Sequence, residues 1–300
     1  MVIKNFQELI EKVQGFENRK RVAVVAAADE HTLEAVFKAE ENNIVTPVLI
    51  GDVSKIKEIL DKLDKELDEK FIMDAKDDSD AAYKAVELIH KGEADFIMKG
   101  KIQTADLLKA VVDKEKGLRT GKVMTHFVIN EVPTYHKLLV AMDGGMMMFP
   151  NLEEKKQIIE GAVNTLIALG YEKPKVAVLS AVEKVNPKMP DTVDAAKLKE
   201  MNQKGEIENC IVEGPISYDL TMSKESARIK GFESPVVGDA DIILTSDIVV
   251  GNVLGKCLVH SAKAKMAGFI VGAKVPVVLT SRASSAEEKY LSLTLSAAVA

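Results

Sequence analysis

The segment Val22-Ala23-Val24-Val25-Ala26-Ala27 is apolar at every position and ends in small residues. A continuous apolar run of this length is typical of a strand buried on both faces. The next segment, 29–42, spaces its apolar residues at helical intervals, and another short apolar strand follows at 47–51. Buried strands that alternate with helices predict a mostly parallel sheet covered on both sides.

The same alternation continues along the whole chain. Further strands are predicted at 95–98, 138–142, 175–180, 209–212, 241–244 and 275–279. Further helices are predicted at 56–67, 78–91, 152–169, 192–203, 223–230, 253–267 and 286–299. The fold class is therefore α/β, and the glycine-containing segment 116–121 is the best candidate for a hinge.

The composition indicates a globular enzyme-sized chain and argues against several other classes. At 300 residues the length favours about two domains. Lys and Arg number 40 and Asp and Glu 46, so a net charge of −6 argues against nucleic acid as a partner. No apolar run approaches the roughly 18 residues of a membrane span. Two cysteines and no secretory segment favour reduced thiols in the cytoplasm.

Familiar cofactor and metal motifs are missing from the sequence. No G-x-G-x-x-G follows the first strand, which argues against a dinucleotide site. The segment 251–256 is one residue short of a nucleotide phosphate loop, and Cys257 stands where a hydroxyl residue would hold magnesium. The five histidines do not cluster at metal-ligand spacing. Most familiar catalytic classes are therefore not supported by the sequence.

Polar motifs remain at four strand ends, where α/β proteins bind ligands. They are 98–106, 212–219, 245–252 and 280–289. In the first, Lys99 and Lys101 bring positive charge, and Thr104 is expected to cap a helix. In the second, Gly214-Pro215 is expected to form a rigid turn after the strand. Each motif also fits a plain strand-to-helix connection.

The third and fourth motifs offer more chemistry. Gly251 lets a ligand approach the backbone, while Asn252 either binds it or caps the next helix. Arg282 follows an apolar strand and suits a phosphate. Both Ser284-x-x-Glu287 and Ser285-x-x-Glu288 satisfy a capping box. Only one can cap the helix, which leaves the other carboxylate to face a cleft.

Together these motifs resemble the phosphate acyltransferase (phosphotransacylase) family, and most closely its phosphate butyryltransferases. The matching stretches are Met98-Lys99-Gly100, Thr104-Ala105-Asp106, Glu213-Gly214-Pro215, Gly238-Asp239-Ala240-Asp241, Asp247-Ile248, Gly251-Asn252 and Ser281-Arg282. The chain length and the ending 281–289 are more similar to the butyryltransferases than to the acetyltransferases.

This resemblance implies two doubly wound α/β domains with an interdomain cleft, similar to isopropylmalate dehydrogenases. The first domain would comprise 1–122 and 277–300, and the second 123–276. The implied reaction is reversible transfer of an acyl group between coenzyme A and inorganic phosphate, which are both substrates. The resemblance implies no metal or redox cofactor, and a homodimer or higher homo-oligomer.

The resemblance also implies roles for individual residues. Ser281 and Arg282 match the catalytic centre, and Glu288 stands where the acetyl-specific relatives place an aspartate proposed as the base. In the implied ternary complex, Glu288 takes the thiol proton, Arg282 holds the phosphoryl group and Ser281 polarises the carbonyl. The residues implied to line the coenzyme A or phosphate site are Lys99, Thr104, Asp247, Gly251 and Asn252.

Other functions are weighed against this hypothesis. An acetyltransferase or a branched-chain variant would use the same chemistry on another acyl group. An oxidative decarboxylase of the isopropylmalate type needs a metal-binding carboxylate cluster and a nicotinamide site, and neither pattern occurs. A non-catalytic acyl-coenzyme A-binding protein has no need for Ser281, Arg282 and a carboxylate in register.

Overall fold

The computed structural model describes residues 2–281 and 284–300. The chain forms two compact units. The flanking unit comprises Phe6–Lys122 and Ala267–Ala300, and the central unit comprises Met1–Asn5 and Val123–Met266. The sequence predicts that the C-terminal segment of the first domain begins at residue 277, whereas that of the flanking unit begins ten residues earlier, at Ala267. The predicted boundaries of the two domains, 1–122 with 277–300 and 123–276, stay a prediction.

The flanking unit is a mostly parallel sheet. Its strands are, in spatial order, β3 (Ile72–Asp74), β2 (Val45–Gly51), β1 (Lys20–Val25), β4 (Phe96–Lys99), β11 (Val277–Val278) and β10 (Lys265–Val271). All neighbouring pairs are parallel except β10 with β11. Val22 of β1 lies opposite Pro47 of β2 and Phe96 of β4. The carboxyl ends of β1, β4 and β11 therefore meet at one edge.

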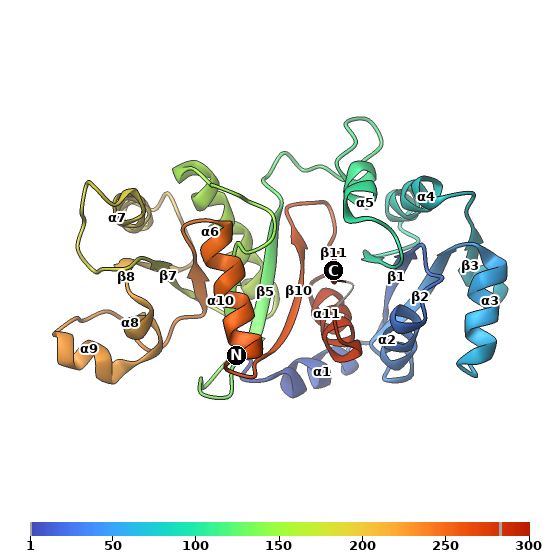
Figure 1. Ribbon diagram of the computed structural model, residues 1–300, viewed down its shortest axis with the longest axis horizontal. Helices are drawn as coiled ribbons and strands as arrows, with labels where there is room; N and C mark the ends of the chain where they lie inside the picture. Colours follow the sequence, from blue (N-terminus) through green and yellow to red (C-terminus); the bar gives the residue numbers. More distant parts are fainter. Residues whose placement is uncertain (1, 282–283) are drawn as a thin grey trace. The chain divides into compact units, whose positions relative to one another are not determined.

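Helices cover both faces of this sheet. They are α1 (Phe6–Gln14), α2 (Glu30–Glu41), α3 (Val53–Lys62), the 3-10 helix η1 (Glu69–Phe71), α4 (Asp78–Lys91), α5 (Thr104–Val111) and α11 (Ala286–Val299). Figure 1 shows α4 and α5 on one face and α1, α2 and α11 on the other. The side chains of Asp29, Asp52 and Asp77 cap α2, α3 and α4 by accepting backbone N–H groups.

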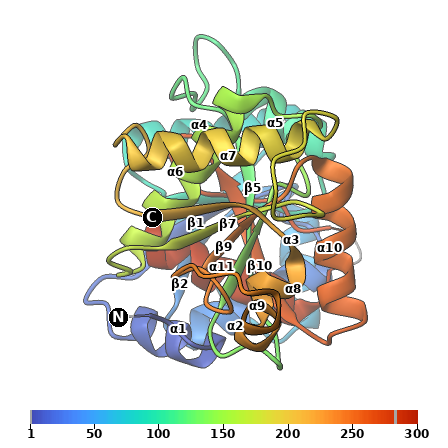
Figure 2. The ribbon, with the colours of Figure 1, turned by 90° about the vertical axis from the view of Figure 1, so that its left-hand side faces the viewer.

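The central unit repeats the layered plan. Its strands are, in spatial order, β5 (Thr125–Glu131), β6 (Leu139–Met142), β9 (Ile242–Leu244), β7 (Lys175–Leu179) and β8 (Ile211–Ile216). Only β5 and β6 pair antiparallel. Its helices are α6 (Leu152–Ala168), α7 (Pro190–Gln203), α8 (Tyr218–Met222), α9 (Lys224–Lys230) and α10 (Ile248–His260). Figure 2 shows α6 and α7 on one face of the sheet and α8 and α9 on the other.

The predicted fold class is confirmed. The sheets are mostly parallel, and the strands first identified by their apolar runs are buried, with Val22, Val24 and Phe96 fully inaccessible. Such burial on both faces is what a parallel sheet between helical layers requires. No helix of the described chain has the length and apolar character needed to cross a membrane.

The helix predicted at 253–267 is wrong at both ends. Helix α10 begins at Ile248, because Asp247 caps it, and it ends at His260. The chain then enters strand β10 at Lys265, where Ala267 and Phe269 are buried. Apolar residues continue from the helix into the strand without interruption, and hydrophobic periodicity alone does not separate the two.

The turn predicted at Gly214-Pro215 is also wrong. Both residues lie within β8, which continues to Ile216. A Cβ on Gly214 would stand 2.8 Å from Cβ of Val178 and 3.1 Å from Cβ of Ala195. The glycine therefore allows β8 to lie close against β7 and α7, which is a packing role rather than a turn.

Candidate functional site

A cavity of about 320 Å³ lies at the carboxyl edge of the flanking sheet. It is lined by Asp29, His31, Thr32, Lys99, Gly100, Lys101, Thr280, Ser281 and Lys289. Lys99 ends β4, and the others follow β1, β4 or β11 or belong to the starts of α2 and α11. The edge beyond the carboxyl ends of parallel strands is where α/β sheets bind ligands. Two predicted site residues, Lys99 and Ser281, are thus brought together.

Gly100 fixes the position of the loop that carries Lys99. Its backbone N–H donates to Val25 O over 2.8 Å, and the next N–H, that of Lys101, donates to Ala26 O over 2.9 Å. A Cβ on Gly100 would lie 2.4 Å from Ala26 O. Only glycine allows this approach, so the loops after β1 and β4 are held side by side at the cavity.

The cavity has an excess of positive charge. Lys99 and Lys289 are 6% and 5% exposed, and Lys101 is exposed. Burial alone would raise the pKa of the Asp29 carboxyl, but hydrogen bonds from Thr32 and the charge of Lys289 bring it below its ordinary value. Three ammonium groups thus face one carboxylate among the described lining residues. This arrangement suits an anion.

Ser284 links Ser281 to the predicted base. Ser284 N–H donates to Ser281 O over 3.0 Å, and the Ser284 hydroxyl donates to Glu288 Oε1 over 2.6 Å. Arg282, which the sequence analysis placed at the catalytic centre, lies outside the described residues. Ser284 was weighed only as a helix cap, so its contact with Glu288 was missed.

The two possible capping registers at α11 are now distinguished. Ser285 is the cap, because its hydroxyl accepts the Glu288 N–H over 3.1 Å. The Glu288 side chain turns to Ser284 instead of completing the box, and Glu287 is exposed. Burial raises the pKa of Glu288 above its ordinary value, although the Ser284 hydrogen bond works in the opposite direction. A raised pKa makes a carboxylate a stronger base.

Thr104 differs from its expected position. It is the first residue of α5, whose cap is Gln103, and no side chain caps this helix end. Thr104 is exposed and is not among the residues that line the cavity. The predicted cap at Thr104 is therefore wrong, because the helix begins at Thr104 itself and the capping position falls on Gln103.

The remaining predicted site residues belong to the central unit, at the start of α10. Asp247 caps this helix by accepting the N–H groups of Val249 and Val250 over 2.9 and 3.1 Å. The expected alternative, a cap at Asn252, is wrong. Burial alone would raise the pKa of Asp247, but these backbone donors and the Ser246 hydroxyl lower it.

Gly251 and Asn252 contact the loop at residues 143–145. A Cβ on Gly251 would lie 2.3 Å from Asp143 O, and Asn252 Nδ2 donates to Gly144 O over 3.1 Å. The buried Asp143 carboxylate accepts N–H groups from its own loop, at Gly145 and Met146, and from His126 at 3.0 Å. The Asp-Gly-Gly sequence at 143–145, typical of a tight turn, was the available signal.

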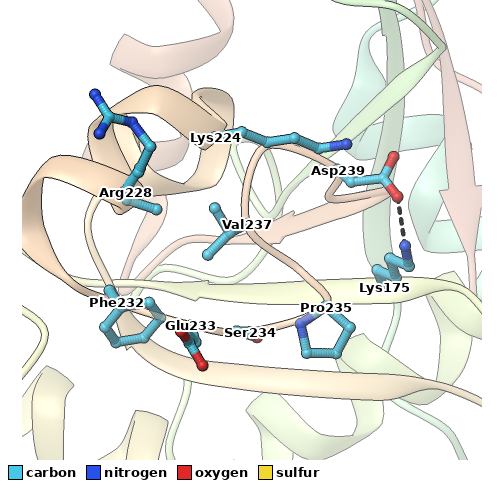
Figure 3. Close-up of a pocket in the computed structure, with 10 residues that line it drawn as sticks. Lys175, Lys224, Arg228, Phe232, Glu233, Ser234, Pro235, Val237 and Asp239 are labelled. Atoms are coloured by element: carbon cyan, nitrogen blue, oxygen red, sulfur yellow. Dashed lines mark hydrogen bonds and ion pairs between the residues drawn. The ribbon is translucent and has the colours of Figure 1, made fainter.

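A second cavity, of about 490 Å³, lies in the central unit (Figure 3). It is lined by Lys175, Lys224, Ala227, Arg228, Phe232, Glu233, Ser234, Pro235, Val237 and Asp239. Lys175 begins β7 and Asp239 precedes β9, so this cavity is at the amino edge of those strands. That edge is opposite to the one where α/β sheets bind ligands.

The acidic motif at 238–241 has a structural role beside this second cavity. Asp239 pairs with Lys175, as Figure 3 shows, and also with His136 and Lys137. Burial alone would raise the pKa of Asp239, but these three partners hold it far below its usual range. The buried Asp241 carboxylate accepts from Lys137 over 2.6 Å. These ion pairs join the strand ends of the unit.

Comparison with known proteins identifies close relatives. A family model described as "Phosphate acetyl/butaryl transferase" matches residues 76–297. A phosphate acetyltransferase from Thermotoga maritima is 47% identical over 98% of this chain and 99% of its own. A phosphate butyryltransferase from Clostridium acetobutylicum is 44% identical over 100% of this chain and 99% of its own.

A solved structure agrees with these matches. The crystal structure of a branched-chain phosphotransacylase from Enterococcus faecalis has a TM-score of 0.82 and 33% identity. The match covers 93% of this chain and 99% of that one. The Thermotoga acetyltransferase is matched from end to end, so a chain of this length is compatible with either acyl group.

Proposed function

The chain belongs to the phosphate acetyl/butaryl transferase family of acyltransferases, and we propose that it moves a butyryl group reversibly between coenzyme A and inorganic phosphate. Support for butyryl comes from the segment 281–289 and from two butyryltransferases at 44% and 42% identity over nearly the whole chain. Acetyl transfer is the second candidate, because the Thermotoga acetyltransferase is 47% identical.

The observation that carries the proposal is the cationic cavity beside Ser281. The buried lysines Lys99 and Lys289 provide positive charge for a phosphate at the cavity. Charge-assisted hydrogen bonds to phosphate are stronger than those between neutral groups. Arg282 follows Ser281 directly in the sequence and would add a planar, bidentate donor.

The chemistry we propose is a direct transfer within a ternary complex. Glu288 takes the proton of the coenzyme A thiol, whose ordinary pKa is about 8.5. The thiolate sulfur attacks the carbonyl carbon of the acyl phosphate, and the carbon–oxygen bond to phosphate breaks with its electron pair leaving on the phosphate. Ser281 polarises the carbonyl and Arg282 holds the leaving phosphate. In reverse, phosphate attacks the thioester and Glu288 returns the proton.

The other predicted site residues complete this proposal. Lys99, Thr104, Asp247, Gly251 and Asn252 would line the phosphate or coenzyme A site. No metal or redox cofactor takes part in the proposed step, because proton transfer and charge stabilisation suffice for acyl transfer. A homo-oligomeric assembly and a cytoplasmic location stay predictions of the sequence.

The test is phosphate-dependent thiol release, followed with a thiol dye. Acetyl-, propionyl-, butyryl- and isobutyryl-coenzyme A are compared, each with and without phosphate. The four-carbon substrates should react fastest. A faster reaction with acetyl-coenzyme A would keep the mechanism and replace butyryl by acetyl. Absence of phosphate-dependent release from all four would contradict the proposed function and favour a binding role.

A further inference from the structure

Lys289 occupies an unfavourable position for a cation. It is 5% exposed and belongs to the first turn of α11. The N-terminal end of a helix carries partial positive charge, so an ammonium group there is repelled rather than stabilised. Removing an ammonium group from water is unfavourable unless close partners compensate for the lost hydration.

Among the described residues, Lys289 makes only long polar contacts, and the Glu288 carboxylate interacts with its charge from the neighbouring position of the helix. Its Nζ lies 3.5 Å from Thr32 Oγ1 and 3.8 Å from Asp29 Oδ2. A charge-assisted hydrogen bond to a carboxylate is typically about 2.7–2.9 Å long. Both contacts are therefore long, and the ammonium keeps capacity to donate.

Asp29 is engaged elsewhere, which explains the long contact. Its Oδ2 accepts the Thr32 N–H over 3.0 Å and the Thr32 hydroxyl over 2.5 Å, as the cap of α2. The Asp29 carboxylate is thus held at the start of α2, and it remains 3.8 Å from Lys289 Nζ. Lys289 also lines the cavity that contains Lys99 and Ser281.

We propose that Lys289 binds a dianionic phosphate group in this cavity, together with Lys99. Lys99, Lys101 and Lys289 line the cavity with the single carboxylate of Asp29, and the Glu288 carboxylate interacts with the Lys289 charge, so cations still outnumber carboxylates where a phosphate would bind. The inference rests on the proposed function for the identity of that phosphate, and it adds a residue that the sequence analysis did not select.

Two sources could supply the phosphate group: free phosphate with its acyl ester, or the phosphates of coenzyme A. The cavity volume of about 320 Å³ is near the lower end of the roughly 300–1,000 Å³ found for small-molecule sites. This size favours inorganic phosphate and the phosphoryl end of the acyl phosphate. Lys289 is therefore assigned to them.

The experiment compares Lys289→Met, Lys289→Arg and Lys38→Met with the unchanged chain. Lys38 is a matched control, because it is an exposed lysine of α2 that lies 4.9 Å above the Tyr290 ring of α11, outside the cavity. The Michaelis constants for phosphate and for coenzyme A are measured separately. Lys289→Met should raise the phosphate constant roughly 10- to 100-fold, the effect of losing a hydrogen bond to a charged group.

The other constants make the assignment specific. The coenzyme A constant should stay within about twofold, since no charged bond to it is lost. Lys289→Arg should recover most of the phosphate affinity, and Lys38→Met should match the unchanged chain. A phosphate constant unchanged in Lys289→Met, or a larger effect on coenzyme A, overturns the inference.

A binding measurement separates this inference from the proposed function. Inorganic phosphate alone should raise the melting temperature of the unchanged chain, as any ligand of the folded state does, and Lys289→Met should lose that shift. If the chain turns over substrate but the shift survives in Lys289→Met, the inference fails and the function stands. If turnover is absent but the shift depends on Lys289, the function fails and the inference stands. The melting curve without phosphate shows whether each variant folds.

Discussion

Two glycines of helix α10 predict opposite effects of the same substitution. Gly251 and Gly255 both lie inside the helix, and neither has a positive φ. A Cβ on Gly255 would meet no atom within 4 Å. A Cβ on Gly251 would lie 2.3 Å from Asp143 O and 2.8 Å from Thr245 Oγ1. Changing each glycine to alanine therefore isolates the close approach of the Asp143 loop.

The magnitudes follow from helix propensity and from packing. Replacing a helix-interior glycine by alanine stabilises by about 1 kcal/mol, so Gly255→Ala should be more stable by that amount. Gly251→Ala gains the same term but must displace the backbone of Asp143, a residue anchored by the three backbone N–H groups that its side-chain carboxylate accepts. Overpacking typically costs about 1–3 kcal/mol, and an anchored obstacle favours the upper value. The net loss is then about 2 kcal/mol.

Thermal unfolding checks this difference. At about 2–4 °C for each kcal/mol in a unit of this size, Gly255→Ala should melt about 2–4 °C higher and Gly251→Ala about 4–8 °C lower. Gly251→Ala should also reduce turnover, because its neighbour Asn252 holds the same loop at Gly144. The reasoning is refuted if the two variants shift in the same direction or if Gly251→Ala melts as the unchanged chain does.

Four further predictions concern charged and nucleophilic groups. Burial raises the pKa of Glu288, so the rate should fall as the pH decreases, around a midpoint above 4.5 where the base becomes protonated. Glu288→Gln should lower kcat by roughly 10²- to 10⁴-fold and abolish this acidic limb of the pH–rate profile. Ser284→Ala removes a donor to that carboxylate, so the limb should move to higher pH, and an unmoved limb would contradict the role of Ser284. Lys137→Met leaves Asp241, which is 4% exposed, without its partner at 2.6 Å, and should lower the free energy of unfolding in denaturant by about 3–5 kcal/mol. Lys204→Met breaks an exposed ion pair and should lower it by less than about 1 kcal/mol. Equal losses in the two variants would refute this contrast. Cys257→Ser should keep normal turnover, because direct transfer uses no cysteine nucleophile. Burial raises the pKa of the Cys210 thiol to about 11, which disfavours the reactive thiolate. An acyl group found on either cysteine in a quenched reaction would contradict direct transfer.

Local sequence patterns predicted most of the helices and strands. They failed where the local sequence does not show which residues are buried. The apolar runs at β1, β2 and β4 were recognised, because their alternation with amphipathic helices leaves one interpretation. Strand β5 was missed, since Thr125 and Asn130 are polar although both are buried. Strand β10 was hidden by the apolar helix before it. Polar residues inside a sheet depend on partners that a local window does not contain.

The candidate site was predicted in part for a related reason. Lys99 and Ser281 were recognised because each follows an apolar strand, and they line one cavity. Asp29 and Lys289 were not selected, although they line the same cavity. In the sequence Asp29 is an ordinary helix cap, and Lys289 is the single lysine of the helix predicted at 286–299. Nothing local shows that Lys289 is buried.

The sequence alone determined the alternation of strands and helices, the strand-end motifs and the family they resemble. These depend on periodicity, turn chemistry and capping, which act over a few residues. The tertiary structure decided that β4 lies between β1 and β11, and hence that residues 29, 99, 281 and 289 share one cavity. Strand order is set by the burial of apolar faces across the whole unit. A lysine 190 positions away from Lys99 in the chain therefore became its neighbour only through that packing.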